Sequence, residues 1–268
     1  MENIIEVKNL IKKFGDFTAV SDISFNVKQG EIFAFLGPNG AGKSTTIKML
    51  TTLLHPSSGS IELNGHNPVN ESAAARRSFG IVFQDPSLDD ELTAWENMEF
   101  HGVLYGVEKS LRKKRIEELM KFVDIWDRKD SLVREFSGGM KRRLEIARGL
   151  LHHPKVMFLD EPTLGLDPQT RNHMWQYLQD LNKSEGITVF FTTHYMEEAS
   201  RIAQRIAIID HGKIIATGTT EELQAQTQTT SLEDAFLKLT GSQIREEEAS
   251  AGDHMRTMGR MFRGTGKR

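Results

Sequence analysis

The 268-residue sequence contains no cysteine. This excludes disulfide bonds, thiolate metal sites and a cysteine nucleophile, and it fits a cytoplasmic protein. Long apolar runs are also missing. The most apolar segments, such as Ile187–Phe191, have the length of a β-strand, whereas a helix that spans a bilayer needs about 18 apolar residues. We therefore expect that, if the protein acts at a membrane, another chain crosses it.

Charge and composition set further limits. The formal net charge is −3, which does not favour a nucleic-acid-coating surface, so we expect no nucleic-acid partner. With 26% charged and 38% hydrophobic residues, the composition is that of a soluble globular protein with one large domain or two small ones. The nine histidines show no metal-ligand spacing, and residues 1–6 lack the basic and apolar regions of a signal peptide.

The most informative stretch is residues 37–44, Gly-Pro-Asn-Gly-Ala-Gly-Lys-Ser. Two glycines separated by four residues and followed by Lys and Ser match the loops that cradle phosphate. Lys43 would reach the β- and γ-phosphates, and Ser44 would bind Mg²⁺. The apolar run 31–36 predicts a buried strand before the loop, and residues 45–54 predict a helix whose N-terminus faces the anion. The predicted nucleotide-binding residues of this loop are Gly37, Pro38, Asn39, Gly40, Ala41, Gly42, Lys43, Ser44 and Thr45.

A pair of acids, Asp160 and Glu161, follows the apolar run 156–159. In an open α/β sheet, the carboxyl ends of the strands face the ligand crevice. Asp160 would hold Mg²⁺ directly or through water, and Glu161 is placed to polarise a water that attacks the γ-phosphate. The alternative is a strand that simply ends in two solvated acids.

A second helix start suited to an anion comes about ninety residues after the first. Ser137 is a natural N-cap for the helical run 140–151, and the glycines that follow it, Gly138 and Gly139, allow close approach of a ligand to the backbone. The alternative is an ordinary capped helix.

The order of the predicted elements defines the fold class. Short strands at 4–10, 19–27 and 60–63 surround the first phosphate-loop strand, and residues 85–151 are helical in pattern. Strands then return at 156–159 and 188–191, with a helix at 171–181 between them and a hairpin around 206–213. This order favours an α/β domain with a mostly parallel core sheet.

Taken together, these residues resemble the ATP-binding-cassette (ABC) ATPase family, and the resemblance covers at least residues 4–218. Phe136–Met140 resembles the family signature Leu-Ser-Gly-Gly-Gln, with Phe for Leu and Met for Gln. The resemblance implies a P-loop NTPase core with an N-terminal antiparallel β subdomain and an inserted α-helical subdomain at about 86–151. It places the nucleotide-binding domain at 4–235 and a partly disordered C-terminal extension at 236–268.

The resemblance also implies roles for single residues. Phe14 resembles the aromatic residue that stacks on adenine, and Gln84 resembles the Gln that reaches Mg²⁺ and couples to a membrane subunit. His194 resembles the switch histidine that senses the γ-phosphate. Asp167 ends the segment 164–167, which resembles the loop that communicates across the dimer, with glycine at 165 where Ser or Ala is usual. The implied catalytic residues are Glu161, His194 and Lys43.

The family implies an assembly as well. ATP and Mg²⁺ are the expected cofactors, and two cassettes pack head to tail, either as a homodimer or with a homologous cassette. Residues 84–97, Gly165 and residues 230–236 look like ABC-2 type subunits, a group that includes daunorubicin-resistance-like exporters. Such a subunit pairs with a separate polytopic membrane subunit, so we expect a peripheral location on the cytoplasmic face of the cell membrane. A drug-like or other hydrophobic substrate is favoured by resemblance alone.

Several alternatives remain at this stage. A soluble cassette ATPase of DNA repair or ribosomes usually carries two cassettes, a coiled-coil insertion or a basic linker, and none is found here. Another alternative is a different phosphate-loop enzyme, such as a GTPase, because Asn182–Glu185 faintly resembles a guanine-reading motif. However, this segment ends in Glu rather than Asp, and it lies before a strand rather than after one. A binding module without turnover conflicts with the presence of Glu161 and His194. Beyond about Gly241 the Met- and Arg-rich tail predicts disorder or, alternatively, a short amphipathic contact with a membrane or partner.

Overall fold

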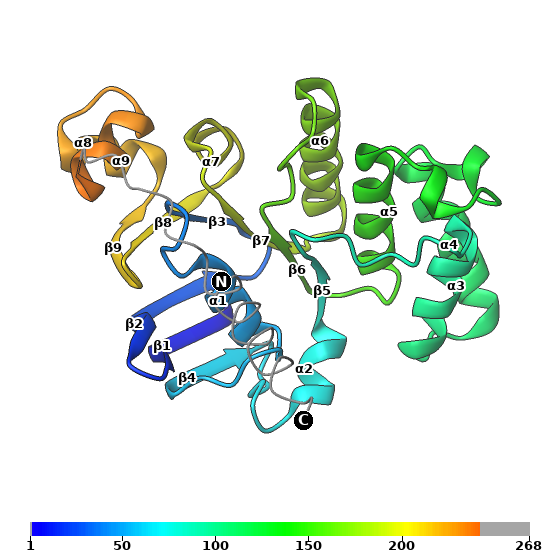
Figure 1. Cartoon of the computed structure of the whole chain (residues 1–268), viewed down its shortest axis with the longest axis horizontal. Coiled ribbons are helices and arrows are strands. Elements are labelled where there is room, and N and C mark those ends of the chain that lie inside the picture. The colour runs from blue at the N-terminus through cyan, green and yellow to red at the C-terminus, as the bar shows by residue number, and fades with distance from the viewer. Residues whose placement is uncertain (1, 242–268) are drawn as a thin grey trace, which may run out of the picture.

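The computed structural model describes residues 2–241 and contains two sheets that share a core (Figure 1). The predictions for the tail lie outside the described residues. A six-stranded sheet has the order β5-β6-β7-β3-β8-β9, and a three-stranded sheet has the order β2-β1-β4. The strands are β1 (Asn3–Phe14), β2 (Phe17–Lys28), β3 (Ile32–Leu36), β4 (Ser58–Leu63), β5 (Phe79–Val82), β6 (Val156–Asp160), β7 (Thr188–Thr193), β8 (Arg205–Asp210) and β9 (Lys213–Gly218).

The six-stranded sheet is parallel except for β9, which forms an antiparallel hairpin with β8. Every residue of β3, β6 and β7 is buried, as expected for continuous apolar runs in a sheet covered on both faces. Because parallel strands end at the same edge, the loops after β3, β6 and β7 meet there. The predicted α/β class with a mostly parallel sheet is confirmed.

The three-stranded sheet is antiparallel throughout and forms the expected N-terminal β subdomain. Strands β1 and β2 have 12 residues each and are longer than predicted, because their pairing continues to the turn at Gly15, which has a φ of 58°. Phe25 of β2 stacks on Phe33 of β3, with 5.9 Å between the ring centroids. Helix α1 contributes to the same core, so the two sheets are joined around it.

The helices cover the sheet and form one separate lobe. The α-helices are α1 (Lys43–Leu50), α2 (Ser72–Ser78), α3 (Ala94–Leu104), α4 (Lys109–Phe122), α5 (Gly138–Leu150), α6 (Pro168–Glu185), α7 (Met196–Ile202), α8 (Thr220–Thr227) and α9 (Leu232–Thr240). Helices α3, α4 and α5 lie together beyond the β5 edge of the sheet, as expected of an inserted helical subdomain, while α8 and α9 lie on the opposite side (Figure 1). No helix within residues 2–241 is long and apolar enough to cross a membrane.

Some boundaries differ from the sequence prediction. Helix α1 ends at Leu50 rather than continuing to residue 54, because Thr52 adopts a left-handed conformation with a φ of 66°. Helix α6 extends beyond the predicted 171–181 at both ends, from the Asp167 cap to Gly186. Helix α9 runs across position 235, where the sequence places the end of the nucleotide-binding domain, and Phe236 is buried in the main core.

Candidate active site

The loop between β3 and α1 has the shape that the glycine pattern predicts. Gly40 and Gly42 have φ values of 76° and 105°, in the region that favours glycine. A Cβ on Gly37 would lie 2.4 Å from the carbonyl oxygen of Ile209, and one on Gly42 would lie 2.7 Å from that of Ala19. The loop therefore passes too close to neighbouring backbone for any other residue at these two positions.

Lys43, the first residue of α1, is held inside this loop. Its ammonium donates hydrogen bonds to the carbonyl oxygens of Gly37 at 2.8 Å and Pro38 at 3.1 Å. It also lies 3.1 Å from Oε1 of Glu161, and both side chains are less than 10% exposed. A buried charge is tolerated when it is paired in this way. The loop lysine and the acid after β6, which the sequence predicted separately, are in direct contact.

Asp160 ends β6 and faces β7, where the register places it opposite Thr192. Its Oδ1 accepts a hydrogen bond from Thr192 Oγ1 at 2.6 Å and from Ser44 Oγ at 3.2 Å. Burial raises the pKa of Asp160, an effect that the hydrogen bonds from Thr192 and Ser44 oppose. Two of the three residues predicted to bind Mg²⁺, Ser44 and Asp160, therefore lie side by side and present oxygen atoms.

Glu161 lies between two cationic or potentially cationic groups. One carboxylate oxygen contacts Lys43, and the other lies 3.2 Å from Nδ1 of His194. Burial is the largest influence on the pKa of Glu161 and raises it, but the contact with His194 and the charge of Lys43 together outweigh burial and leave the pKa below its ordinary value. Glu161 is thus an ionised carboxylate that can accept a hydrogen bond from water.

The backbone at Glu161 is unusual and is fixed by Thr192. Glu161 has a φ of 46°, which is rare for a residue with a side chain. Its N–H donates to Thr192 Oγ1 at 2.9 Å, while the same hydroxyl donates to Asp160. Backbone strain of this kind costs about 1–3 kcal/mol and occurs at sites where geometry must be held. Thr192 therefore aligns both acids from the neighbouring strand.

His194 directly follows β7 and borders open space beside the phosphate loop. Its side chain is 30% exposed, and its ring lies 4.1 Å from the ring of Tyr195. His194 and the phosphate loop line the same cavity, which has a volume of about 260 Å³. The residues that line it are Gly37, Pro38, Asn39, His194, Met196 and Phe236. The switch histidine predicted from the sequence is therefore at the phosphate loop and in contact with Glu161.

Two other predicted site residues lie away from this cluster. Phe14 is half-buried at the end of β1, with Lys12 Nζ 5.0 Å from its ring centroid. Gln84 is exposed and lies two residues after the end of β5 at Val82. Arg142 of α5 donates to the Gln84 carbonyl at 3.1 Å. The structure connects Gln84 to the helical subdomain, and no contact among the described residues connects it to Asp160.

The second predicted anion-binding turn is formed as expected at the start of α5. Ser137 is its N-cap and accepts a hydrogen bond from the N–H of Met140 at 3.3 Å. Ser137 and Gly138 are exposed. A Cβ on Gly139 would lie 2.7 Å from the methyl group of Thr170, so α5 approaches α6 closely here. Within residues 2–241, no contact links this turn to the phosphate loop of the same chain.

Asp167 caps the start of α6, next to that turn. Its Oδ1 accepts from the N–H groups of Gln169 and Thr170, both at 3.0 Å, and its Oδ2 accepts from the Thr170 hydroxyl at 2.6 Å. The hydroxyl of Thr170 first, and then the backbone donors, hold the pKa of Asp167 below its ordinary value. Thr170 therefore touches both the turn after Ser137 and the residue predicted to communicate across a dimer.

Sequence reasoning missed Thr192 and a buried carboxylate, Glu198 of α7. A signal for Thr192 exists: two threonines precede His194 at the end of a buried strand, where side chains face the crevice. Glu198 gives no such signal, since a glutamate in a short polar helix normally indicates a solvated surface.

The sequence comparisons agree with this geometry. A family model described as ABC transporter matches residues 20–164. Linearmycin resistance ATP-binding protein LnrL of Bacillus subtilis (strain 168) is 43% identical over 243 residues, which are 91% of this chain and 76% of that protein. Daunorubicin/doxorubicin resistance ATP-binding protein DrrA of Streptomyces peucetius is 42% identical over 243 residues, which are 91% and 72% of the two chains.

Solved structures show the same fold. An ATP-binding subunit of an ABC transporter superposes with a TM-score of 0.81 at 31% identity, over 88% of this chain and 99% of that one. The ATP-binding cassette MJ0796, in a dimeric post-hydrolysis state bound to ADP and Pi, superposes with a TM-score of 0.73 at 29% identity, over 80% of this chain and 98% of that one.

Proposed function

This chain belongs to the ABC transporter family as the ATPase of an exporter, and we propose how its residues hydrolyse ATP and with which partners it works. The two relatives described above are resistance ATP-binding proteins, and the fold of this chain is that of the solved cassettes. The observation that carries the proposal is the position of the Glu161 carboxylate between Lys43 and His194, beside the phosphate loop.

In the proposed reaction, the backbone N–H groups of residues 39–45 bind the phosphates of ATP, and the Lys43 ammonium turns from Glu161 toward the γ-phosphate. The ionised Glu161 carboxylate then accepts a hydrogen bond from the attacking water and orients it. His194, at the edge of the same cavity, donates a hydrogen bond to the γ-phosphate and keeps Glu161 in place. Phe14 is proposed to stack on the adenine.

A magnesium ion fits the donor atoms of Ser44 and Asp160. A hydroxyl and a carboxylate 3.2 Å apart are oxygen ligands of the kind Mg²⁺ prefers, and one or two protein ligands with the substrate phosphates are its usual set. When bound, Mg²⁺ would neutralise charge on the β- and γ-phosphates. Thr192 holds the Asp160 oxygen in position for it. Gln84, which no contact among the described residues connects to Asp160, is proposed as a third ligand.

Hydrolysis is tested first with Glu161→Gln, which keeps the shape of the side chain but removes the ionised carboxylate. We expect this variant to bind ATP normally and to hydrolyse it at least about 100-fold more slowly, a loss typical of removing a general base. Glu62→Gln, an exposed glutamate on β4, is the control and should hydrolyse ATP at the original rate. If Glu161→Gln hydrolyses ATP at the wild-type rate, Glu161 is not the catalytic base.

The site of a single chain is proposed to be completed by a second cassette. Ser137, Gly138 and Gly139 form an anion-binding turn that is away from the phosphate loop of its own chain, with Ser137 and Gly138 exposed. In a head-to-tail pair, the turn of one cassette faces the ATP of the other. The dimeric state of the matching cassette MJ0796 supports this arrangement. Thr170 lies close to Gly139 of the turn and donates a hydrogen bond to Asp167. We propose that Asp167 communicates across the interface between the two cassettes.

The membrane partner is proposed to dock on the helical subdomain. Phe100, Val103 and Leu104 of α3 are 62%, 55% and 67% exposed and lie on one face of the helix at the spacing i, i+3 and i+4. Helix α3 lies at the outer end of the lobe, away from the sheet (Figure 1). We propose that a cytoplasmic segment of a polytopic membrane subunit covers this face, which places the ATPase peripherally on the cytoplasmic face of the cell membrane.

Affinity purification from gently solubilised source cells tests this surface. The tagged chain should retain a stoichiometric polytopic membrane protein, and Phe100→Glu with Leu104→Glu should lose it while the isolated chain keeps its ATPase activity. Leu53→Glu, which changes a 55% exposed leucine outside the helical subdomain, should retain the partner. Recovery of the same partner by the α3 variant would place the docking surface elsewhere. The identified partner would also test whether the substrate is a drug-like or other hydrophobic molecule, as the relatives' names suggest.

A further inference from the structure

A buried carboxylate outside the catalytic cluster contacts both loops that carry the cluster. Glu198 belongs to α7 and is 3% exposed. Its Oε1 accepts a hydrogen bond from Thr163 Oγ1 at 2.6 Å, and its Oε2 accepts one from Thr193 Oγ1 at 3.2 Å. Thr163 lies two residues after Glu161, and Thr193 directly precedes His194. One carboxylate thus binds the chain on either side of the contact between Glu161 and His194.

A third contact extends this arrangement to the segment that ends in Asp167. Arg171 of α6 has its Nε 3.5 Å from Oε1 of Glu198. Its guanidinium lies 4.9 Å from the ring centroid of Tyr195, which packs against His194, and it donates to the carbonyl of Leu166 at 3.5 Å. Arg171 therefore contacts three groups. They are Glu198, Tyr195 next to the switch histidine, and Leu166 in the loop before α6.

We propose that Glu198 is a positioning residue for ATP hydrolysis: by binding Thr163 and Thr193 it sets the separation between Glu161 and His194, and through Arg171 it links that separation to the loop that ends in Asp167. The proposal rests on the roles proposed above for Glu161 and His194. Glu198 itself touches neither the nucleotide-binding loop nor Glu161 among the contacts of the described residues.

The energetics favour such a role over simple packing. A buried carboxylate is costly unless its oxygens are satisfied, and here both oxygens accept from hydroxyl groups of two different loops. Helix α7 has seven residues and no side-chain cap, so Glu198 also fixes the helix that follows His194. A displacement of about 1 Å at a reacting group can cost about 100-fold in rate. The loss of this acceptor should therefore slow the chemical step more than it weakens ATP binding.

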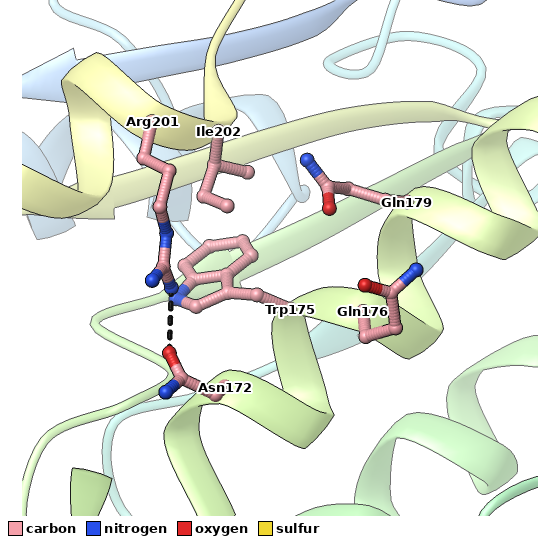
Figure 2. A pocket seen from close by; sticks show the side chains of 6 residues that line it. All are labelled: Asn172, Trp175, Gln176, Gln179, Arg201 and Ile202. Carbon is pink, nitrogen blue, oxygen red and sulfur yellow. Dashed lines mark hydrogen bonds between the residues drawn. The ribbon is translucent and has the colours of Figure 1, made fainter. Parts of the chain in front are cut away.

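A second polar contact between α6 and α7 supplies the matched control. Arg201 donates to Asn172 Oδ1 at 2.8 Å, as Figure 2 shows. Both residues are exposed and line a cavity of about 310 Å³ between the two helices, together with Trp175, Gln176, Gln179 and Ile202. This contact joins the same pair of helices without touching Thr163, Thr193 or His194. Its removal separates a general effect of helix packing from the specific effect of Glu198.

The test is steady-state ATP hydrolysis together with equilibrium ATP affinity. Glu198→Gln, which has nearly the same shape, should lower kcat by about 10- to 100-fold while KM and ATP affinity stay within about two-fold. Arg201→Ala should leave both kcat and KM unchanged. A variant with Thr163→Val and Thr193→Val should show a similar loss in kcat, and adding Glu198→Gln to it should cause little further loss, because the residues act as one unit.

Three outcomes would overturn the proposal. They are a wild-type kcat in Glu198→Gln, an ATP affinity that falls in parallel with kcat, and an equal loss of kcat in Arg201→Ala. Glu161→Gln, measured beside these variants, separates this proposal from the one it rests on. If Glu161→Gln still turns over, the assignment of the catalytic base fails; if Glu161→Gln is inactive and Glu198→Gln is fully active, only the role of Glu198 fails.

Discussion

At Glu161, burial and neighbouring charge have opposite effects on the pKa of the carboxyl. Burial alone would favour its neutral form, in which it could not orient a water by accepting a hydrogen bond. Its contacts with His194 and Lys43 reverse that preference and hold its pKa below the ordinary value of 4.5. A carboxyl with a lowered pKa stabilises the folded state at higher pH, and this contribution is lost as the pH falls through the folded-state pKa.

His194→Ala should therefore raise the pKa of Glu161. Without His194, the charge of Lys43 is the main influence left that lowers the pKa of Glu161 against the effect of burial. The carboxyl should therefore take up its proton at a higher pH than in the original protein. An NMR titration of isotope-labelled glutamate side chains would measure this shift directly, and His173→Ala, an exposed histidine on α6, should leave the titration unchanged. An unchanged or lower Glu161 pKa in His194→Ala would show that His194 does not support the charged form.

At the scale of elements, the site exists because three parallel strands end together. Strand β3 delivers the phosphate loop, β6 delivers the two acids, and β7, between them in the sheet, delivers Thr192 and His194.

Glycines set how closely the phosphate loop can approach its neighbours. Gly40 and Gly42 both have positive φ values, but a Cβ would meet nothing within 4 Å at Gly40, whereas it would lie 2.7 Å from a backbone carbonyl at Gly42.

This difference predicts two sizes of stability loss for the same substitution. Gly40→Ala adds backbone strain alone, which costs about 1 kcal/mol. Gly42→Ala adds strain and a clash with the Ala19 carbonyl, so it should cost at least about twice as much. Since 1 kcal/mol shifts Tm by about 2–4 °C in a domain of this size, thermal unfolding should resolve the two variants. Equal Tm values for both would contradict the close approach at Gly42.

The sequence predicted these elements where one local pattern determined them. The glycine loop, the apolar runs of β3, β6 and β7 and the N-cap at Ser137 could each be found without tertiary information. The end of α1 could not, because apolar residues continue to Leu54 after Thr52 has already turned the chain into a left-handed conformation. Glu198 could not either, since its partners, Thr163 and Thr193, come from two different strand ends and meet only in the folded sheet.

At the scale of the whole molecule, the two helix starts predicted to bind anions belong to separate parts of the chain. The phosphate loop lies at the centre of the sheet, and the turn after Ser137 lies on the helical subdomain next to the Asp167 cap. A head-to-tail pair would bring each turn to the other chain's loop and create two identical composite sites, with ATP held between the chains. Closing and reopening such a pair could drive a membrane subunit through two conformations.

Ser137→Arg tests this pairing. The long cationic side chain should fill the exposed turn and prevent closure over the partner's ATP, while the phosphate loop of each monomer still binds nucleotide. We expect the Glu161→Gln protein to form a dimer with ATP on a sizing column, and the same protein with Ser137→Arg to remain monomeric with an ATP affinity within about two-fold. Ser60→Arg adds the same charge to an exposed position on β4 and should still allow the dimer. ATP-driven dimerisation that survives Ser137→Arg would show that the turn after Ser137 does not face the nucleotide of a second chain, and the composite site would then have to be assigned to other residues.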